Sequence, residues 1–175
     1  MLTSPMRDLL AEYPSARRAL FAHFHIGGCQ SCAYSETDTL QQVCQQHDLN
    51  PDDVQQAILQ SHEEEQLLLI SPPDLAQKLT SPSPPTLVDT RTREEHEAVA
   101  IPNSQLLTEN TLAQLNSENP NQQIILYDHS GKSVLDQVSW FRGHQLKNTF
   151  ALAGGIDAYS QQVDPSLPRY RLEID

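Results

Sequence analysis

From residue 67 onward, short apolar runs alternate with stretches of helical periodicity. The apolar runs are LLLI, TLVDT, AIPNSQLL, QIILY and TFALA, and the helical stretches are PPDLAQKL, REEHEA, LAQLN, SVLDQVSWF and GGIDAY. This alternation is typical of βαβ units, in which successive strands pair in parallel and the connecting helices cover the sheet. The pattern therefore predicts an α/β fold with a central, mostly parallel sheet flanked by helices.

The part of the chain before this alternation carries helical signals only. Ser4 followed by Pro5 predicts an N-cap and a first helical position, and Asn50 followed by Pro51 predicts the same for a later helix. Gly27 is placed to end the helix that precedes the cysteine-containing turn. These signals predict a small all-helical domain ahead of the α/β domain.

The length and charge of the chain limit its organisation and its partners. Its 175 residues suffice for one ordinary domain and a small appended one, which we place at residues 65–175 and 1–64. Eleven Lys and Arg against 23 Asp and Glu give a net charge of -12, which argues against a nucleic acid or an anionic membrane as partner. The longest apolar run, residues 67–70, is too short to span a membrane, and the N-terminus lacks the apolar core of a signal peptide. We expect a cytoplasmic protein.

All the cysteines lie near the N-terminus, which suggests a local redox or metal role rather than a disulfide framework. The spacing of Cys29 and Cys32 allows a disulfide or two ligands to one metal centre, so an iron-sulfur cluster or zinc is a candidate cofactor. Cys44 could add a third ligand, and His25 or His47 a fourth. Alternatively, Cys44 is a buried, inert thiol, because it lies on the apolar stripe of its predicted helix.

The segment ILYDHSGKS joins the apolar run ending at Tyr127 to the next helical pattern through a polar loop. The loop consists of Asp128, His129, Ser130, Gly131, Lys132 and Ser133. A strand that enters a helix through such a turn directs backbone N–H groups at one point, and that point favours an anion. A Walker A phosphate loop is excluded, since Leu126 stands where its first glycine is required. We expect His129 to be exposed, and Trp140 and Phe141 on the following helix to pack in or near the core.

Three segments, LVDTRTREEHEAVAIPNS, ILYDHSGKS and FALAGGIDAYS, resemble rhodanese-homology domains, the sulfurtransferase fold, in their order and spacing. The family has an Asp-x-Arg after an early strand, here Asp89 and Arg91, and an Ile-Pro pair about ten residues later. It closes with a Gly-Gly-x-x-x-aromatic turn, here Gly154, Gly155 and Tyr159. The resemblance implies a rhodanese-like arrangement with the polar loop at the active-site position.

The loop departs from the pattern of active family members. Their loop, Cys-x-x-Gly-x-Arg-Ser, begins with the nucleophilic cysteine that accepts a sulfane sulfur as a persulfide. Alignment on Gly131 places Asp128 at the cysteine, Ser133 at the arginine and Val134 at the serine. The resemblance therefore implies no catalytic residue at this vestigial loop. Either a binding pocket is kept there without catalysis, or Asp128 fills the loop and caps the following helix.

The N-terminal segments LLAEYPSARRALFAHFHIGGCQSC and DTLQQVC resemble small helical domains with a Cys-x-x-Cys turn, associated with hybrid-cluster proteins and redox disulfides. Together, the two resemblances imply a catalytically impaired rhodanese-like protein. It would act as a binding, carrier or regulatory protein in sulfur, iron-sulfur or redox metabolism. Its partner would be another protein of that metabolism. One alternative is an active sulfurtransferase with Cys29 or Cys32 as persulfide carrier. The other is a purely structural protein-interaction module with inert thiols.

Overall fold

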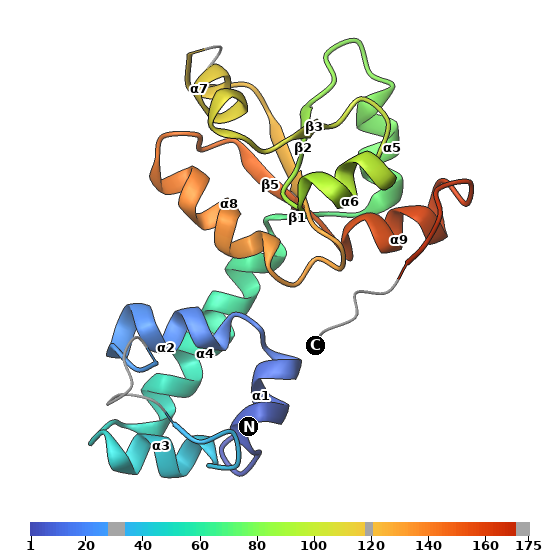
Figure 1. Ribbon diagram of the computed structural model, residues 1–175. Helices are drawn as coiled ribbons and strands as arrows, with labels where there is room; N and C mark the ends of the chain where they lie inside the picture. Colours follow the sequence, from blue (N-terminus) through green and yellow to red (C-terminus); the bar gives the residue numbers. More distant parts are fainter. Residues whose placement is uncertain (28–33, 118–120, 171–175) are drawn as a thin grey trace. The chain divides into compact units, whose positions relative to one another are not determined.

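A computed structural model of the chain describes residues 1–27, 34–117 and 121–170 (Figure 1). The chain forms two compact units, Met1–Leu67 and Leu68–Asp175. Within the described residues, no helix combines the length and the apolar character needed to cross a bilayer.

The first unit is helical, as predicted. Its helices are α1 (Met6–Glu12), α2 (Ala16–Phe24), α3 (Leu40–Gln46) and α4 (Pro51–Gln66). Their apolar faces meet in one core, made of Met6, Leu9, Ala16, Ala19, Leu20, Ile26, Leu40, Val43, Cys44, Val54 and Ile58. Asn50 caps α4, because its side chain accepts the backbone N–H of Asp52. Arg18 of α2 forms a two-pronged ion pair with Glu65 of α4, at 2.5 and 2.8 Å, which ties the two helices together.

Two predicted helix ends in this unit are wrong. Ser4 does not cap α1, because Pro5 is extended and forms an antiparallel bridge with Thr39, so the helix starts one residue later. Gly27 does not end α2, since His25 already takes the left-handed conformation (φ 56°) that closes the helix. At α1 a contact with a distant residue, Thr39, sets the helix start, whereas at α2 the local backbone of His25 ends the helix before Gly27 is reached.

The second unit is an α/β domain built on a five-stranded parallel sheet, which confirms the predicted fold class. Its strands are β1 (Leu69–Ile70), β2 (Thr86–Asp89), β3 (Gln105–Leu106), β4 (Ile124–Tyr127) and β5 (Thr149–Leu152). Its helices are α5 (Pro72–Leu79), α6 (Arg93–Ala98), α7 (Glu109–Ser117), α8 (Val134–Gly143) and α9 (Gly155–Gln162). The strand order β1-β5-β4-β2-β3 puts β4 at the centre, between β5 and β2.

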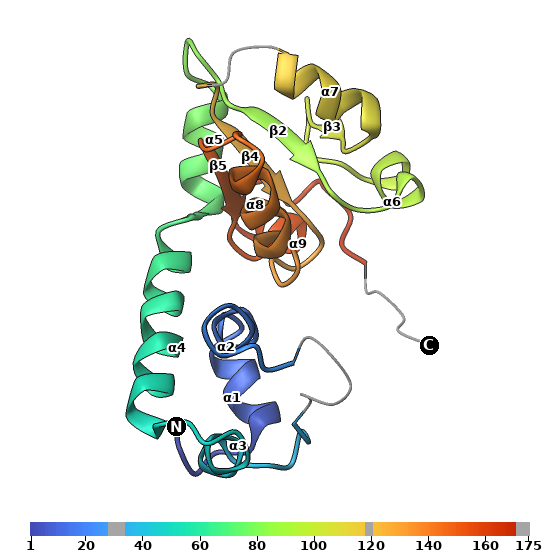
Figure 2. The same cartoon turned by 90° about the vertical axis from the view of Figure 1, so that its left-hand side faces the viewer.

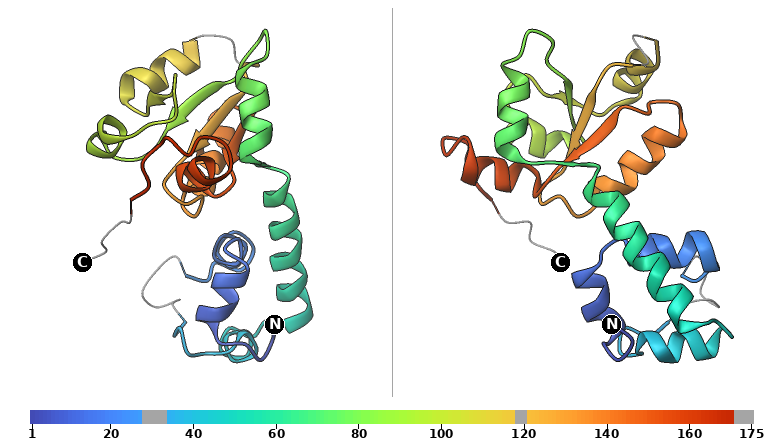
Figure 3. Two further views of the ribbon diagram at one scale, coloured as in Figure 1. Left: turned by 90° about the vertical axis from the view of Figure 1, so that its right-hand side faces the viewer. Right: turned by 180° about the vertical axis from the view of Figure 1, so that it is seen from behind.

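Helices cover both faces of this sheet, so all four residues of β4 are buried. Leu75 of α5 and Ile156 of α9 pack on one face, and α7 and α8 pack on the other. Figure 2 and Figure 3 show these two helical layers. On α8, Phe141 faces the sheet, as predicted. Trp140 points outward and is 45% exposed, so its predicted position in or near the core is wrong. Neighbouring residues lie about 100° apart around a helix, and the two rings therefore face different sides.

The turn after β5 supports the loop that follows β4. Gly154 and Gly155 both have positive φ, 70° and 61°. The backbone of Gly155 lies so close to the loop that a Cβ there would stand 2.5 Å from the carbonyl oxygen of Asp128. Ile156 N–H donates to that same carbonyl oxygen at 3.0 Å. The start of α9 therefore docks directly on the backbone of the loop, and only glycine allows this approach.

We predict that Gly155→Ala lowers the free energy of unfolding by about 2–4 kcal/mol, through its positive φ and its backbone clash. The matched control is Gly143→Ala at the last residue of α8, where an added Cβ meets no atom within 4 Å. The control should leave stability unchanged or raise it by up to about 1 kcal/mol. Urea denaturation measures both variants, and equal effects would contradict the close approach at Gly155.

Candidate functional site

The loop between β4 and α8 is organised around the side chain of Asp128. One carboxylate oxygen accepts the backbone N–H of Gly131, and the other accepts those of Ser133 at 2.9 Å and Val134 at 3.1 Å. The donors that would hold an external anion therefore already hold this carboxylate. Because Ser133 is the N-cap residue of α8 and Val134 its first residue, the same contacts satisfy N–H groups at the start of the helix. The geometry agrees with the interpretation in which Asp128 fills the loop itself.

The other loop residues differ in exposure. Ser130, Lys132 and Ser133 are exposed. His129 is half-buried, so its predicted exposure is wrong: its ring centroid lies 4.5 Å from that of Tyr170, in the segment after α9. Its Nδ1 is buried and has no hydrogen-bond partner within the described residues. The C-terminal segment thus covers one side of the loop.

A buried polar cluster lies beside the loop, at the end of β2. The Asp89 side chain is fully buried and pairs with Arg91, whose Nε and Nη2 lie 2.9 and 2.6 Å from its two oxygens. Tyr127 OH donates to the same carboxylate at 2.8 Å, and His96 Nδ1 lies 2.8 Å from it. Burial favours the neutral carboxyl, but the hydrogen bonds from Arg91, His96 and Tyr127 outweigh burial and lower the pKa of Asp89. Because the Asp89 carboxylate is inaccessible to solvent, a substrate cannot reach it. Its role is to link the ends of the strands.

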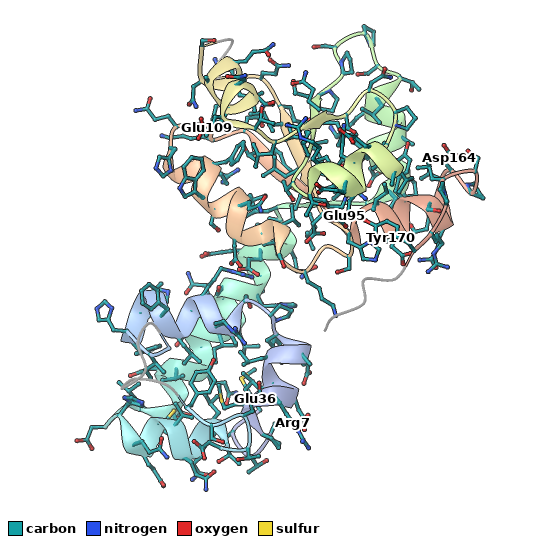
Figure 4. The ribbon with its side chains drawn as sticks, in the orientation of Figure 1. Arg7, Glu36, Glu95, Glu109, Asp164 and Tyr170 are labelled. Carbon is teal, nitrogen blue, oxygen red and sulfur yellow. The ribbon has the colours of Figure 1, made fainter. Side chains whose placement is uncertain are left out.

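Tyr170 extends the cluster to the C-terminal segment. Its hydroxyl accepts from Arg91 Nη1 at 2.7 Å and donates to Glu95 Oε1 at 2.6 Å, and the labelled side chains of Glu95 and Tyr170 meet in Figure 4. Burial and the Glu95 carboxylate raise the pKa of Tyr170 to about 12, against the opposing effect of Arg91. A pocket of about 370 Å³ between His129, Asp157 and Tyr170 lies open beside the loop.

The structure brings the predicted landmarks Asp89, Arg91 and the loop together at one end of the sheet. The backbone of Gly154 and Gly155 packs directly against the backbone of the loop. Sequence reasoning missed His96, Glu95 and Tyr170. The one local signal was Thr92-x-x-Glu95, which forms a capping box on α6 and holds Glu95 in place. Nothing in the sequence indicated that Tyr170 joins a cluster formed 79 residues earlier.

The candidates in the helical unit are partly outside the described residues. Cys29 and Cys32 lie there, in the segment 28–33. Cys44 is fully buried among apolar side chains, and this burial raises the pKa of its thiol. This burial agrees with the interpretation of Cys44 as a core residue, and its candidacy as a redox or metal residue beside Cys29 and Cys32 stays a prediction. His25 is exposed, and no group of three or more His, Cys, Asp or Glu in the described part of the chain is arranged to hold a metal ion.

A comparison with known protein families finds a match in the α/β unit. The family model described as the rhodanese-like domain matches residues 71–162. No cysteine occurs within that span. None of the curated proteins matches the chain.

The chain is also similar in part to several solved structures. A rhodanese-like domain protein from Staphylococcus aureus is 27% identical, with 59% of this chain and 98% of that chain covered and a TM-score of 0.48. A protein from Staphylococcus saprophyticus is 24% identical, with 57% and 97% covered and a TM-score of 0.46. The rhodanese-like domain of an Anabaena protein is 18% identical, with 62% and 87% covered and a TM-score of 0.48.

Tyr127→Phe removes the hydrogen bond to the buried Asp89 carboxylate together with the contacts of the same hydroxyl to Ser104 Oγ and the Ile101 N–H. It should lower the free energy of unfolding at pH 7 by about 1–3 kcal/mol. A lowered carboxyl pKa stabilises the fold above the unfolded value of about 3.9 and ceases to do so as pH falls through the folded value. The gap between variant and wild type should therefore shrink below about pH 4. Urea titrations at several pH values measure it.

The control for this prediction is Tyr159→Phe. Tyr159 is also buried in the second unit, but its hydroxyl makes no hydrogen bond within the described residues. Its effect on stability should not vary with pH between about 3 and 7, where tyrosine does not titrate. A Tyr127→Phe gap that stays constant across this range would contradict the role given to the Asp89 charge.

Asp128→Cys tests the donors of the loop directly. In a Cys29→Ser, Cys32→Ser background, the new thiolate should be stabilised by the N–H groups that now bind the carboxylate. We expect a thiol pKa at least about one unit below the ordinary 8.5, measured from the pH dependence of alkylation. Ser139→Cys, an exposed position on α8, is the matched control and should titrate near 8.5. Equal values for the two thiols would show that the loop donors do not stabilise an anion.

Proposed function

Because this chain belongs to the rhodanese-like family, we propose that it is a family member whose loop does not transfer sulfur. In this proposal the protein acts as a binding, carrier or regulatory protein in sulfur, iron-sulfur or redox metabolism. Its partner would be another protein of that metabolism, and its α/β domain would act as a scaffold.

The observation that carries the proposal is the Asp128 carboxylate held by backbone donors of the loop. Sulfur transfer from thiosulfate requires a thiolate that attacks the outer sulfur, releases sulfite and keeps a persulfide. A carboxylate offers no sulfur for such a bond, and residues 71–162 contain no cysteine that could replace it. The loop donors would support an anion, but the anion present has no capacity to store sulfane sulfur.

The reactive element in this proposal is the Cys29-Cys32 pair. Two cysteines separated by two residues can cycle between dithiol and disulfide, or contribute two ligands to an iron-sulfur cluster or a zinc ion. The cofactor is therefore left open between these forms. Metal analysis and an absorption spectrum of anaerobically purified protein separate a metal centre from a metal-free dithiol.

A sulfurtransferase assay with thiosulfate and cyanide tests the proposal. We expect no turnover above background from the wild type, and none from Cys29→Ser, because neither contains a thiol in the loop. A single-domain rhodanese with its loop cysteine serves as the positive control. Turnover that disappears in Cys29→Ser or Cys32→Ser would overturn the proposal in favour of a persulfide carried by the N-terminal cysteines. Turnover that survives both substitutions would place activity at the loop and would also overturn it.

A further inference from the structure

An apolar groove of about 390 Å³ lies on the α7–α8 side of the second unit. Leu107 and Leu112 line it from the α7 side, and Gln137, Trp140 and Phe141 line it from α8. None of its lining residues belongs to the 128–133 loop, so the groove is separate from the site described above.

Trp140 places a large, partly exposed aromatic ring in this groove. Its side chain is 45% exposed, although burying a tryptophan removes a large apolar area from water. The ring is nonetheless held in place, since it stacks on His144 at 4.0 Å between centroids and meets Phe141 edge-on at 5.7 Å. A fixed, exposed tryptophan beside an apolar depression is typical of the anchor point of a protein interface.

The polar groups of the groove define what it can accept. Among the described residues that line the groove, Glu109 alone is charged, and it is an acid. The side-chain oxygen of Gln137 is buried and has no hydrogen-bond partner within the described residues. Its terminal torsion is soft, so the amide can turn this acceptor toward an occupant. Both groups favour a ligand that brings N–H donors and positive charge, and the net charge of -12 favours the same partner.

We propose that this groove binds an amphipathic helix of a partner protein, with a large apolar side chain against Trp140 and a neighbouring Lys or Arg at Glu109. A groove between two helices matches the helix-in-groove mode of recognition, in which apolar side chains one turn apart provide the anchors. The groove is an open surface depression, whereas small-molecule sites enclose most of their ligand. The inference goes beyond the proposed function, because it does not depend on whether the loop or the cysteines are active.

Trp140 is the only tryptophan of the chain, so its fluorescence reports on this groove alone. The probe is a synthetic amphipathic helix of Leu and Lys, titrated into the full-length protein. We expect a blue shift of the emission that saturates, because the ring leaves water on binding. A peptide with Glu in place of Lys, and a Leu-Lys peptide of scrambled spacing, should give no saturable shift.

Two charge variants separate specific docking from general attraction to an acidic protein. Glu109→Lys should weaken binding of the Leu-Lys peptide about threefold to fivefold, as expected for loss of an exposed ion pair and its reversal. Glu97→Lys changes the net charge by the same amount at an exposed position of α6 and should change binding by less than about twofold. Trp140→Ala, followed by calorimetry, should weaken binding about thirtyfold or more if the ring is the anchor.

Several results would overturn this inference. They are the absence of a saturable shift, equal binding of the Leu-Glu and scrambled peptides, and equal effects of Glu109→Lys and Glu97→Lys. An emission shift that depends on protein concentration without peptide would assign the groove to a second copy of the chain instead.

Discussion

The buried carboxylate of Asp89 holds together the end of the sheet at which the loop and the C-terminal segment meet. A charge in the protein interior is tolerated only when it is paired and hydrogen-bonded, and each of its oxygens has such partners. Those partners, Arg91, Tyr127 and His96, come from the turn after β2, the end of β4 and α6. Since Arg91 also bonds to Tyr170, one ion pair fixes the strand ends and the last described segment.

Two carboxylates thus stand at the same end of the sheet, and the protein satisfies both internally. Asp89 takes its donors mainly from side chains, and Asp128 takes its donors from the backbone of its own loop. Both arrangements satisfy the carboxylate oxygens with hydrogen-bond donors. Their consequences differ, because Asp89 joins elements that are distant in sequence, whereas Asp128 orders a single turn and the start of α8.

The features that sequence predicted correctly depend on short-range contacts. The cap at Asn50 and the backbone donors around Asp128 involve residues at most six positions apart, and the parallel sheet follows from apolar runs of strand length. The features it missed depend on distant packing. Tyr170 meets Arg91 across 79 residues, and the groove beside Trp140 is lined jointly by residues of α7 and α8. Periodicity indicates which residues face the sheet but not which elements cover the remaining surface.

The way Asp128 is held also constrains any ligand of this domain. An external anion would have to displace a carboxylate that is tethered to its own donors, and a tethered group competes at a high effective concentration. The groove at Trp140 has the opposite preference, since Glu109 and the Gln137 acceptor favour cations and N–H donors. The two regions therefore cannot select the same ligand chemistry. Recognition by this α/β unit is better suited to its helical surface, because the donors at its strand ends are already occupied.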